Sequence, residues 1–373
     1  MKNDTGTMAV AERRPALVKS LAAALVVAFA LMFSSAWAPV ASATEVGTLA
    51  ASGLQVSGNT ITYTQTSLGY QVIPVQLQAG AVKLDFVAGA SSAQVGIYAS
   101  ADDSGTVSGR IATVYANDPY GIGSNYGNVA KSGTYYVMFY ASKYSGKTGS
   151  KAVITQYPYA EVKTANLNEA TLGTGCGNKD TVAYYKINVK KRGLLTLNVV
   201  DMTGSGYSSS VALCNAKKTS LIGTYFPYTS LDKPVYFGVK PGTYLIAVKS
   251  YATLYNVVPQ FTAVTKAVKA KKSKAVKISK GKKLSAVMAA GEKTAWYKFK
   301  VTKKKKYKIA LTGYLNNSVK MTFSGKGYYS GSSYLPSGAN IATFKTNKLK
   351  PGTYYVKVTT TNKGNGLYTI TWK

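Results

Sequence analysis

A Gly-Thr-Tyr tripeptide occurs three times at almost constant spacing, and this repeat limits the possible folds more than any other feature of the chain. Its glycines, Gly133, Gly242 and Gly352, are 109 and 110 residues apart. A chance tripeptide would not keep such a period, so the repeat marks a structural module. The copies at Gly242 and Gly352 follow a proline, and Pro-Gly favours a turn that leads into a strand.

Each tripeptide is accompanied by segments that alternate apolar and polar residues, as half-buried strands do. In one of them the apolar Tyr297, Phe299 and Val301 alternate with Lys298 and Lys300. Similar segments, separated by Gly, Ser and Asn, recur at 69–73, 82–86, 94–98, 183–189, 194–199, 211–214, 307–311, 319–323 and 367–371. The sequence therefore predicts an all-β fold of three tandem antiparallel β-sandwich, jelly-roll-like domains.

Residues 1–43 predict a signal peptide ahead of these domains. Basic residues precede an apolar run over 21–33, and an Ala-Ser-Ala site follows at 41–43. The run is shorter than the about 20 residues that a membrane-spanning helix needs. We expect cleavage after Ala43, a secreted or cell-envelope-associated protein and no stable membrane insertion of the mature chain; an uncleaved anchor is the alternative.

The rest of the chain divides at the repeat period. The predicted modules are 44–160, 161–265 and 266–373, with a lysine-rich linker at the start of the third. Together they are too long for one ordinary core.

The order of segments in the last module resembles the bacterial pre-peptidase C-terminal domain. The resemblance rests on the aromatic-Tyr-Lys strand at 295–301, the basic turn after it, Pro-Gly-Thr-Tyr at 351–354 and Tyr-Thr-Ile at 368–370. It is strongest over 280–373 and weaker towards the N-terminus. The resemblance implies jelly-roll-like sandwiches with an auxiliary role outside the cell, such as binding a substrate or matrix. Some such domains bind calcium, but the third module has one acidic residue, and no metal is expected.

Positive charge increases steeply from module to module. Residues 44–160 carry 6 basic and 5 acidic residues, 161–265 carry 11 and 5, and 266–373 carry 25 and 1. Nine of these lysines lie within 266–283, where repulsion between neighbouring ammonium groups predicts an extended, solvated linker. Such charge attracts polyanions through counterion release, although lysines also serve solubility and block edge pairing.

The basic clusters supply candidate residues for polyanion binding. They are Lys190, Lys191, Arg192, Lys271, Lys272, Lys274, Lys303, Lys304, Lys305 and Lys306. Lysine greatly outnumbers arginine, which suits diffuse attraction more than bidentate recognition of one phosphate or base. The expected partners are extracellular anionic polymers such as teichoic acid, acidic glycans or extracellular DNA, or a cell-wall glycan, with a host matrix protein as a further class.

Tyrosines and cysteines provide two other predictions. Candidate aromatic contacts are Tyr225, Tyr228, Tyr328, Tyr329 and Tyr334, although such tyrosines often only cap a core. The two cysteines, Cys176 and Cys214, are predicted to form a disulfide because the chain is exported; free thiols are the alternative.

Catalysis is disfavoured because the chain has no histidine, the usual general base and metal ligand. Asp102 and Asp103 fit turn chemistry better than a calcium loop. We therefore expect a binding or adhesion protein that is not an enzyme and has no cofactor. A purely structural array of spacer domains is the alternative, and an auxiliary protein for an extracellular hydrolase, or an atypical hydrolase, is the third.

Overall fold

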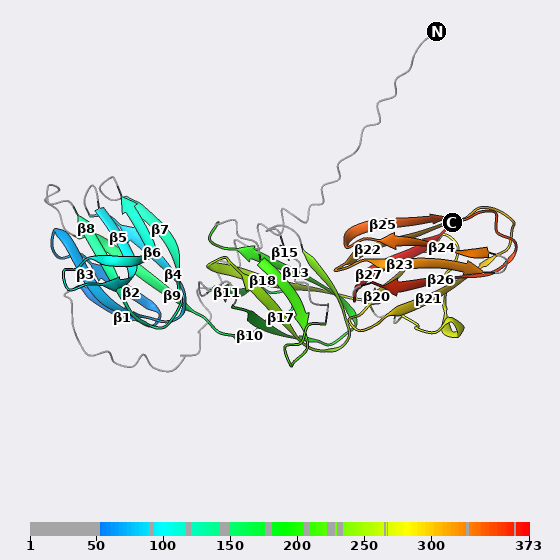
Figure 1. Ribbon diagram of the computed structural model, residues 1–373, viewed down its shortest axis with the longest axis horizontal. Coiled ribbons are helices and arrows are strands. Elements are labelled where there is room, and N and C mark those ends of the chain that lie inside the picture. Colours follow the sequence, from blue (N-terminus) through cyan, green and yellow to red (C-terminus); the bar gives the residue numbers. More distant parts are fainter. Residues whose placement is uncertain are drawn as a thin grey trace, which may run out of the picture. The chain divides into compact units, whose positions relative to one another are not determined.

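The computed structural model describes residues 53–89, 93–116, 121–141, 149–175, 181–204, 209–221, 228–229, 234–264, 266, 268–325, 328–361 and 363–373. The predicted signal peptide lies outside these residues. Within them, no helix is long and apolar enough to cross a membrane. The fold is all-β, as predicted, and the strands form six sheets that pair into three two-layer sandwiches (Figure 1).

The first sandwich uses the strands up to Pro158. Its five-stranded sheet has the order β1 (Leu54–Ser57), β2 (Thr60–Thr64), β9 (Lys151–Pro158), β4 (Gly80–Val87) and β7 (Ile122–Val129). Its four-stranded sheet has the order β3 (Gly69–Leu77), β8 (Gly133–Ala141), β5 (Ala93–Ala101) and β6 (Val107–Ala116). All pairings are antiparallel.

The second sandwich has the same two-layer construction. The order in its five-stranded sheet is β10 (Val162–Thr164), β12 (Ala183–Val189), β17 (Gly242–Ser250), β14 (Ser209–Cys214) and β15 (Tyr228–Thr229). The four-stranded sheet has the order β11 (Thr171–Thr174), β18 (Leu254–Ala263), β13 (Gly193–Asp201) and β16 (Val235–Val239).

The third sandwich repeats the strand order of the second. Its five-stranded sheet runs β19 (Val276–Lys277), β21 (Thr294–Val301), β26 (Gly352–Thr360), β23 (Val319–Gly325) and β24 (Tyr328–Leu335). Its four-stranded sheet runs β20 (Leu284–Met288), β27 (Gly366–Trp372), β22 (Lys308–Leu315) and β25 (Gly338–Lys345). The short edge strands β10 and β19 pair in parallel with β12 and β21, the only departures from antiparallel pairing among the described strands.

Each sandwich has its own apolar core, built from the inward residues of both sheets. In the third core, Tyr297 of β21 and Tyr368 of β27 join hydroxyl to hydroxyl across the layers at 2.6 Å. Tyr185 and Tyr255 make the equivalent bond in the second core at 3.1 Å. Burial raises the pKa of Tyr297 to about 12, so the pair stays protonated and satisfies two polar groups that would otherwise be costly to bury.

The Gly-Thr-Tyr repeat has a structural explanation. In each copy the tyrosine hydroxyl donates to the carbonyl oxygen four residues upstream: Tyr135 to Lys131, Tyr244 to Lys240 and Tyr354 to Lys350. The bond closes the turn that leads into the central strand of one sheet, as a tyrosine corner does in other sandwiches. Tyr135 and Tyr354 are buried, and Tyr244 is partly buried.

Residues 266–283 are not the extended linker that the lysine run predicts. Ile278 is buried in the third core, and Val268 and Val276 pack against it. Ala275 is buried as well. Lys272–Lys274 form a 3-10 turn, and β19 then joins the sheet edge. Apolar residues spaced between the lysines anchor this segment, while all nine ammonium groups remain exposed.

The described residues do not show the predicted disulfide. Cys214 is a buried free thiol, 2% exposed in the second core, and Cys176 lies outside the described residues. The register explains the result for Cys214, which lies opposite Leu245, five residues along β17 from its end at Ser250. Gly175 instead bonds the carbonyl oxygen of Thr253, beyond that strand end.

We expect Tyr368→Phe to destabilise the third sandwich by about 1–3 kcal/mol, because it leaves the Tyr297 hydroxyl buried without its partner. The double variant Tyr297→Phe/Tyr368→Phe should recover part of this loss. Trp296 and Trp372 are the only tryptophans after residue 43, so tryptophan fluorescence during urea unfolding reports on this sandwich. The exposed Tyr334→Phe is the control, and equal effects of Tyr368→Phe and this control would contradict the assignment.

Candidate functional site

The predicted polyanion-binding residues lie in three places. Lys190–Arg192 form the turn between β12 and β13 of the second sandwich. Lys271–Lys274 lie beside the five-stranded sheet of the third sandwich, and Lys303–Lys306 form the turn between β21 and β22. Every lysine among these candidates is exposed, whereas Arg192 is not. The basic turn of the second sandwich therefore differs from the other two groups, because one of its candidate residues is not exposed.

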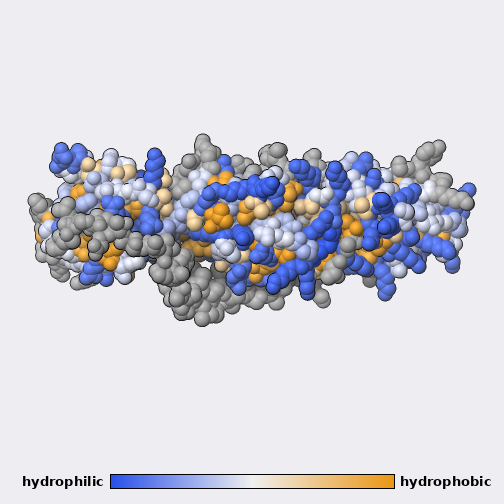
Figure 2. Space-filling model, turned by 90° about the horizontal axis from the view of Figure 1, so that it is seen from below, coloured by the Kyte–Doolittle hydropathy of each residue, from blue (hydrophilic) through white to orange (hydrophobic). Residues whose placement is uncertain are grey.

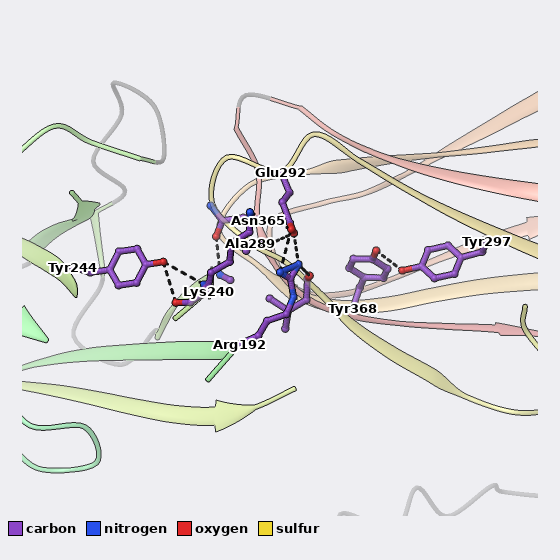
Figure 3. A network of polar contacts seen from close by, with 10 residues as sticks. Arg192, Lys240, Tyr244, Ala289, Glu292, Tyr297, Asn365 and Tyr368 are labelled. Carbon is purple, nitrogen blue, oxygen red and sulfur yellow. Dashed lines mark hydrogen bonds and ion pairs between the residues drawn. The ribbon is translucent and has the colours of Figure 1, made fainter. Parts of the chain in front are cut away.

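Arg192 is engaged by the third sandwich and is not a solvated charge. Its guanidinium donates to both oxygens of Glu292, with an Nη1 to Oε1 distance of 3.1 Å, and to the carbonyl oxygen of Val287 at 3.2 Å (Figure 3). The two side chains are only 10% and 18% exposed. Lys240 contacts the same carboxylate at 3.4 Å, and the Ala289 amide donates to it at 2.9 Å.

Backbone contacts accompany this ion pair. The Gly238 amide donates to Asn365 Oδ1 at 2.8 Å, and the Ala290 amide donates to the Gly238 carbonyl oxygen at 2.9 Å. A Cβ at position 238 would lie 2.0 Å from the Met288 carbonyl oxygen, so only glycine permits this approach. The rings of Tyr236 and Tyr314 are 5.2 Å apart. The basic turn of the second sandwich thus has a structural role.

The use of Glu292 leaves the third sandwich without a carboxylate for its own lysines. Glu292 is the only acidic residue in 266–373, and both of its ion-pair partners, Arg192 and Lys240, come from the second sandwich. Among the described residues, no lysine of the third sandwich is ion-paired with an aspartate or glutamate. Its ammonium groups depend on solvent ions or on an external anion.

Eleven of these lysines gather at the end of the third sandwich that is opposite Glu292, and we call this group the lysine end. The two ends are separated by the eight residues of β21, about 27 Å of strand. The lysine end is held together by the Val301 to Gly352 pairing, the Lys305 to Leu349 bridge and the Lys308 to Lys345 pairing. Its members, all exposed, are Lys280, Lys282, Lys303, Lys304, Lys305, Lys306, Lys308, Lys345, Lys348, Lys350 and Lys373.

A buried tyrosine fixes the shape of the turn at this end. The Tyr307 side chain is 4% exposed, and its hydroxyl donates to the Lys303 carbonyl oxygen at 2.9 Å. The Tyr307 amide also donates to Thr346 Oγ1. Lys305 Nζ lies 5.4 Å from the Tyr307 ring centroid. The neighbouring Lys280 lowers the pKa of Lys305, as expected where like charges are held close together.

Only part of the aromatic prediction can be placed. Tyr225 lies outside the described residues, as do the side chains of Tyr228, Tyr328 and Tyr329. Tyr334 is 56% exposed on β24, with Lys320 Nζ 5.7 Å from its ring centroid.

Sequence reasoning missed four residues that the structure brings together near Lys272. Trp296 of β21 and Tyr355 of β26 lie on the outer side of the five-stranded sheet, where Trp296 is opposite Lys357 and Tyr355 is opposite Lys298. The alternation of residues along the strands predicts that all four side chains point away from the core. Their proximity depends on the antiparallel pairing of β21 with β26, about 60 residues later in the chain.

Among its described residues, the first sandwich has neither a comparable group of exposed lysines nor a comparable group of aromatic rings and lysines. Asp102 accepts hydrogen bonds from the Ser104 and Thr106 amides and from the Ser104 hydroxyl, and these bonds lower its pKa. This geometry matches the predicted turn chemistry. Among the described residues, no group of three or more His, Cys, Asp and Glu could hold a metal.

Comparison with known proteins adds little beyond the fold class. No protein-family model matches the chain, and no curated protein matches it. Among solved structures, the pre-peptidase C-terminal domain of a Bacillus anthracis collagenase is 20% identical, over 27% of this chain and 95% of that domain, with a TM-score of 0.23. The strands themselves define the chain as an all-β protein, and a pre-peptidase C-terminal domain is among the structures that it resembles weakly.

Two larger enzymes also share limited similarity. A GH2 β-galacturonidase from Eisenbergiella tayi is 12% identical, over 54% of this chain and 35% of that chain, with a TM-score of 0.18. Tripeptidyl peptidase 2 is 10% identical, over 86% of this chain and 32% of that chain, with a TM-score of 0.21. This chain therefore spans about a third of either enzyme, and similarity this low carries no functional argument.

We expect the contact between Arg192 and Glu292 to be worth more than a surface ion pair. A double-mutant cycle of Arg192→Met and Glu292→Gln, followed by far-UV circular dichroism in urea, which reports on all three sandwiches, should give a coupling energy of about 1.5–3 kcal/mol, as for hydrogen bonds to charged groups. Lys218 and Glu161, an exposed pair within the second sandwich, provide the matched cycle. A coupling below about 0.5 kcal/mol at Arg192 would place the pair with ordinary surface ion pairs.

Proposed function

We propose that this protein is a secreted or cell-envelope-associated binding protein whose third sandwich binds an extracellular anionic polymer. The observation that carries the proposal is the lysine end, eleven exposed lysines without an acidic side chain nearby, on a sandwich whose only carboxylate pairs with Arg192 and Lys240. Solubility alone is served by interspersed charges of both signs. A one-sign surface instead raises the local concentration of polyanions.

The surface of the third sandwich supports the same proposal. Figure 2 shows hydrophilic side chains crowded over this part of the chain, with small apolar areas between them. A polymer that neutralises several of these ammonium groups releases counterions, which makes binding favourable and strongly dependent on salt. Teichoic acid, acidic glycans and extracellular DNA all carry the charge that is required.

The titration of Lys305 predicts how binding depends on pH. Lys280 lowers the pKa of Lys305 in the free protein, and a bound polyanion would raise it again. Binding is therefore accompanied by proton uptake at Lys305 at alkaline pH, and affinity should fall as the pH rises towards the range in which Lys305 loses its proton.

A binding role is favoured over a catalytic one. An open depression of about 310 Å³ lies on the outer side of the four-stranded sheet of the third sandwich and is lined by Thr312, Gly313, Tyr314, Asn340, Ile341, Leu367 and Thr369. This lining contains no carboxylate, histidine or lysine, and Tyr314 is the only one of its side chains that could act as a general acid or base. The structural alternative, a spacer array without a ligand, is separated from the proposal by the following experiment.

Replacing Lys303, Lys304, Lys305 and Lys306 by glutamine in the full chain should weaken binding to immobilised heparin, lipoteichoic acid and double-stranded DNA. For DNA, the slope of log affinity against log salt should become shallower by up to about 3.6, since each of the four phosphate contacts that are lost contributes about 0.9. The matched control replaces four exposed lysines of the first two sandwiches, Lys131, Lys151, Lys186 and Lys217. Elution of the unmodified chain from all three columns at physiological salt, or equal losses in both variants, would contradict the proposal.

A further inference from the structure

The outer side of the five-stranded sheet in the third sandwich carries aromatic rings and lysines in alternation. The β21–β26 register places Trp296 opposite Lys357 and Lys298 opposite Tyr355. The β23–β24 register places Lys320 opposite Tyr334. Together with Lys272, which reaches over the sheet from the 3-10 turn, these residues form what we call the ring-lysine face. Its seven members are Lys272, Trp296, Lys298, Lys320, Tyr334, Tyr355 and Lys357.

The rings hold the ammonium groups in position on this face. Lys272 Nζ lies 4.6 Å from the Tyr355 ring centroid and 5.9 Å from that of Trp296. Lys357 Nζ lies 5.7 Å from the Trp296 ring, and Lys320 Nζ lies 5.7 Å from the Tyr334 ring. The Trp296 and Tyr355 rings themselves meet edge to face at 6.5 Å. Each contact is favourable, so less side-chain freedom is lost when a ligand binds.

Hydroxyl groups fill the positions between rings and lysines. Thr322 lies between Lys357 and Ser332 across the sheet, and Thr359 lies between Thr294 and Lys320. All are outward residues of their strands. The face therefore offers ammonium groups, aromatic rings and hydroxyls, and none of its residues is acidic.

We propose that the ring-lysine face is the binding site for an acidic polysaccharide. The proposal rests on the proposed function, because it assigns a location and a ligand class to the anion binding of the third sandwich. A carboxylated or sulfated sugar chain presents anionic groups to the lysines, C–H surfaces to the rings and hydroxyls to the threonines and serines. Neighbouring strands lie about 4.8 Å apart, close to the length of one sugar in an extended chain, so successive sugars match successive strands.

Other anionic polymers fit this face less well. A phosphate polymer such as teichoic acid or polyphosphate needs the lysines alone and leaves the rings without a function. A single-stranded nucleic acid binds through stacking of its bases on open rings. A nucleic acid is therefore the competing ligand for the rings, and oligothymidylate binding distinguishes it from a polysaccharide.

The test compares variants of the full chain in calorimetric titrations with heparin oligosaccharides. Tyr334→Thr and Trp296→Thr remove rings without changing the charge, and each should lower affinity about fivefold to tenfold. Tyr70→Thr in the first sandwich, where the tyrosine is 73% exposed, is the control for loss of an exposed ring. It should change the affinity for heparin oligosaccharides by less than about twofold. Because Tyr334 is exposed, its variant keeps the test decisive even if Trp296→Thr impairs folding.

A pair of charge variants separates this inference from the proposed function. Lys320→Gln/Lys357→Gln on the face and Lys308→Gln/Lys345→Gln at the lysine end remove the same charge. A loss at least about five times larger for the face pair supports the inference. Equal losses, with no effect of ring removal, would overturn the inference and leave a diffuse polyanion surface.

Two further outcomes are decisive. If oligothymidylate binds more tightly than heparin and ring removal weakens its binding, the choice of a polysaccharide is overturned. It is also overturned if polyphosphate binds, heparin does not, and ring removal has no effect on polyphosphate binding. Absence of any polyanion binding by the unmodified chain would overturn the proposed function itself.

Discussion

Strict alternation along the strands of the third sandwich forces its lysines outward, and the surface chemistry of this sandwich depends on that constraint. Tyr297, Phe299 and Val301 are each 1% exposed in the core, so Lys298 and Lys300 between them must face solvent. Charged groups have no stable place in such a core unless they are paired. Because Glu292 is the only acidic residue in 266–373, the outward positions accumulate a charge of one sign.

The one carboxylate available, Glu292, is used at the contact with the second sandwich. Arg192 occupies the position in the second sandwich that Lys303–Lys306 occupy in the third, the turn after the first long strand of the five-stranded sheet. One turn contacts the following sandwich and its arginine is paired, whereas the other lies at the lysine end and is exposed. Equivalent turns in a repeated fold thus carry different roles.

Much of the fold follows from the sequence because its determinants are local. Period-two alternation marks the strands, and the spacing of Gly133, Gly242 and Gly352 counts the sandwiches. The pairing of Arg192 with Glu292 was not predictable, since it joins residues 100 positions apart in two sandwiches. The packing of Ala275 and Ile278 was obscured by nine surrounding lysines, whose repulsion favours an extended chain. The disulfide predicted at Cys214 is not shown, since Cys214 is a free thiol, and composition alone does not determine which residues strand register brings together. The ring-lysine face is an intermediate case: each member is recognisable as outward, but their proximity depends on strand pairing.

Lysine acetylation footprinting of the full chain with and without heparin shows whether the ammonium groups of the third sandwich that lack a carboxylate partner form the binding surface. We expect protection of Lys272, Lys320, Lys357 and the lysine end, with little change at Lys151 and Lys186 of the first two sandwiches. Uniform protection along the chain, or none at any lysine of the third sandwich under conditions where heparin is bound, would contradict it.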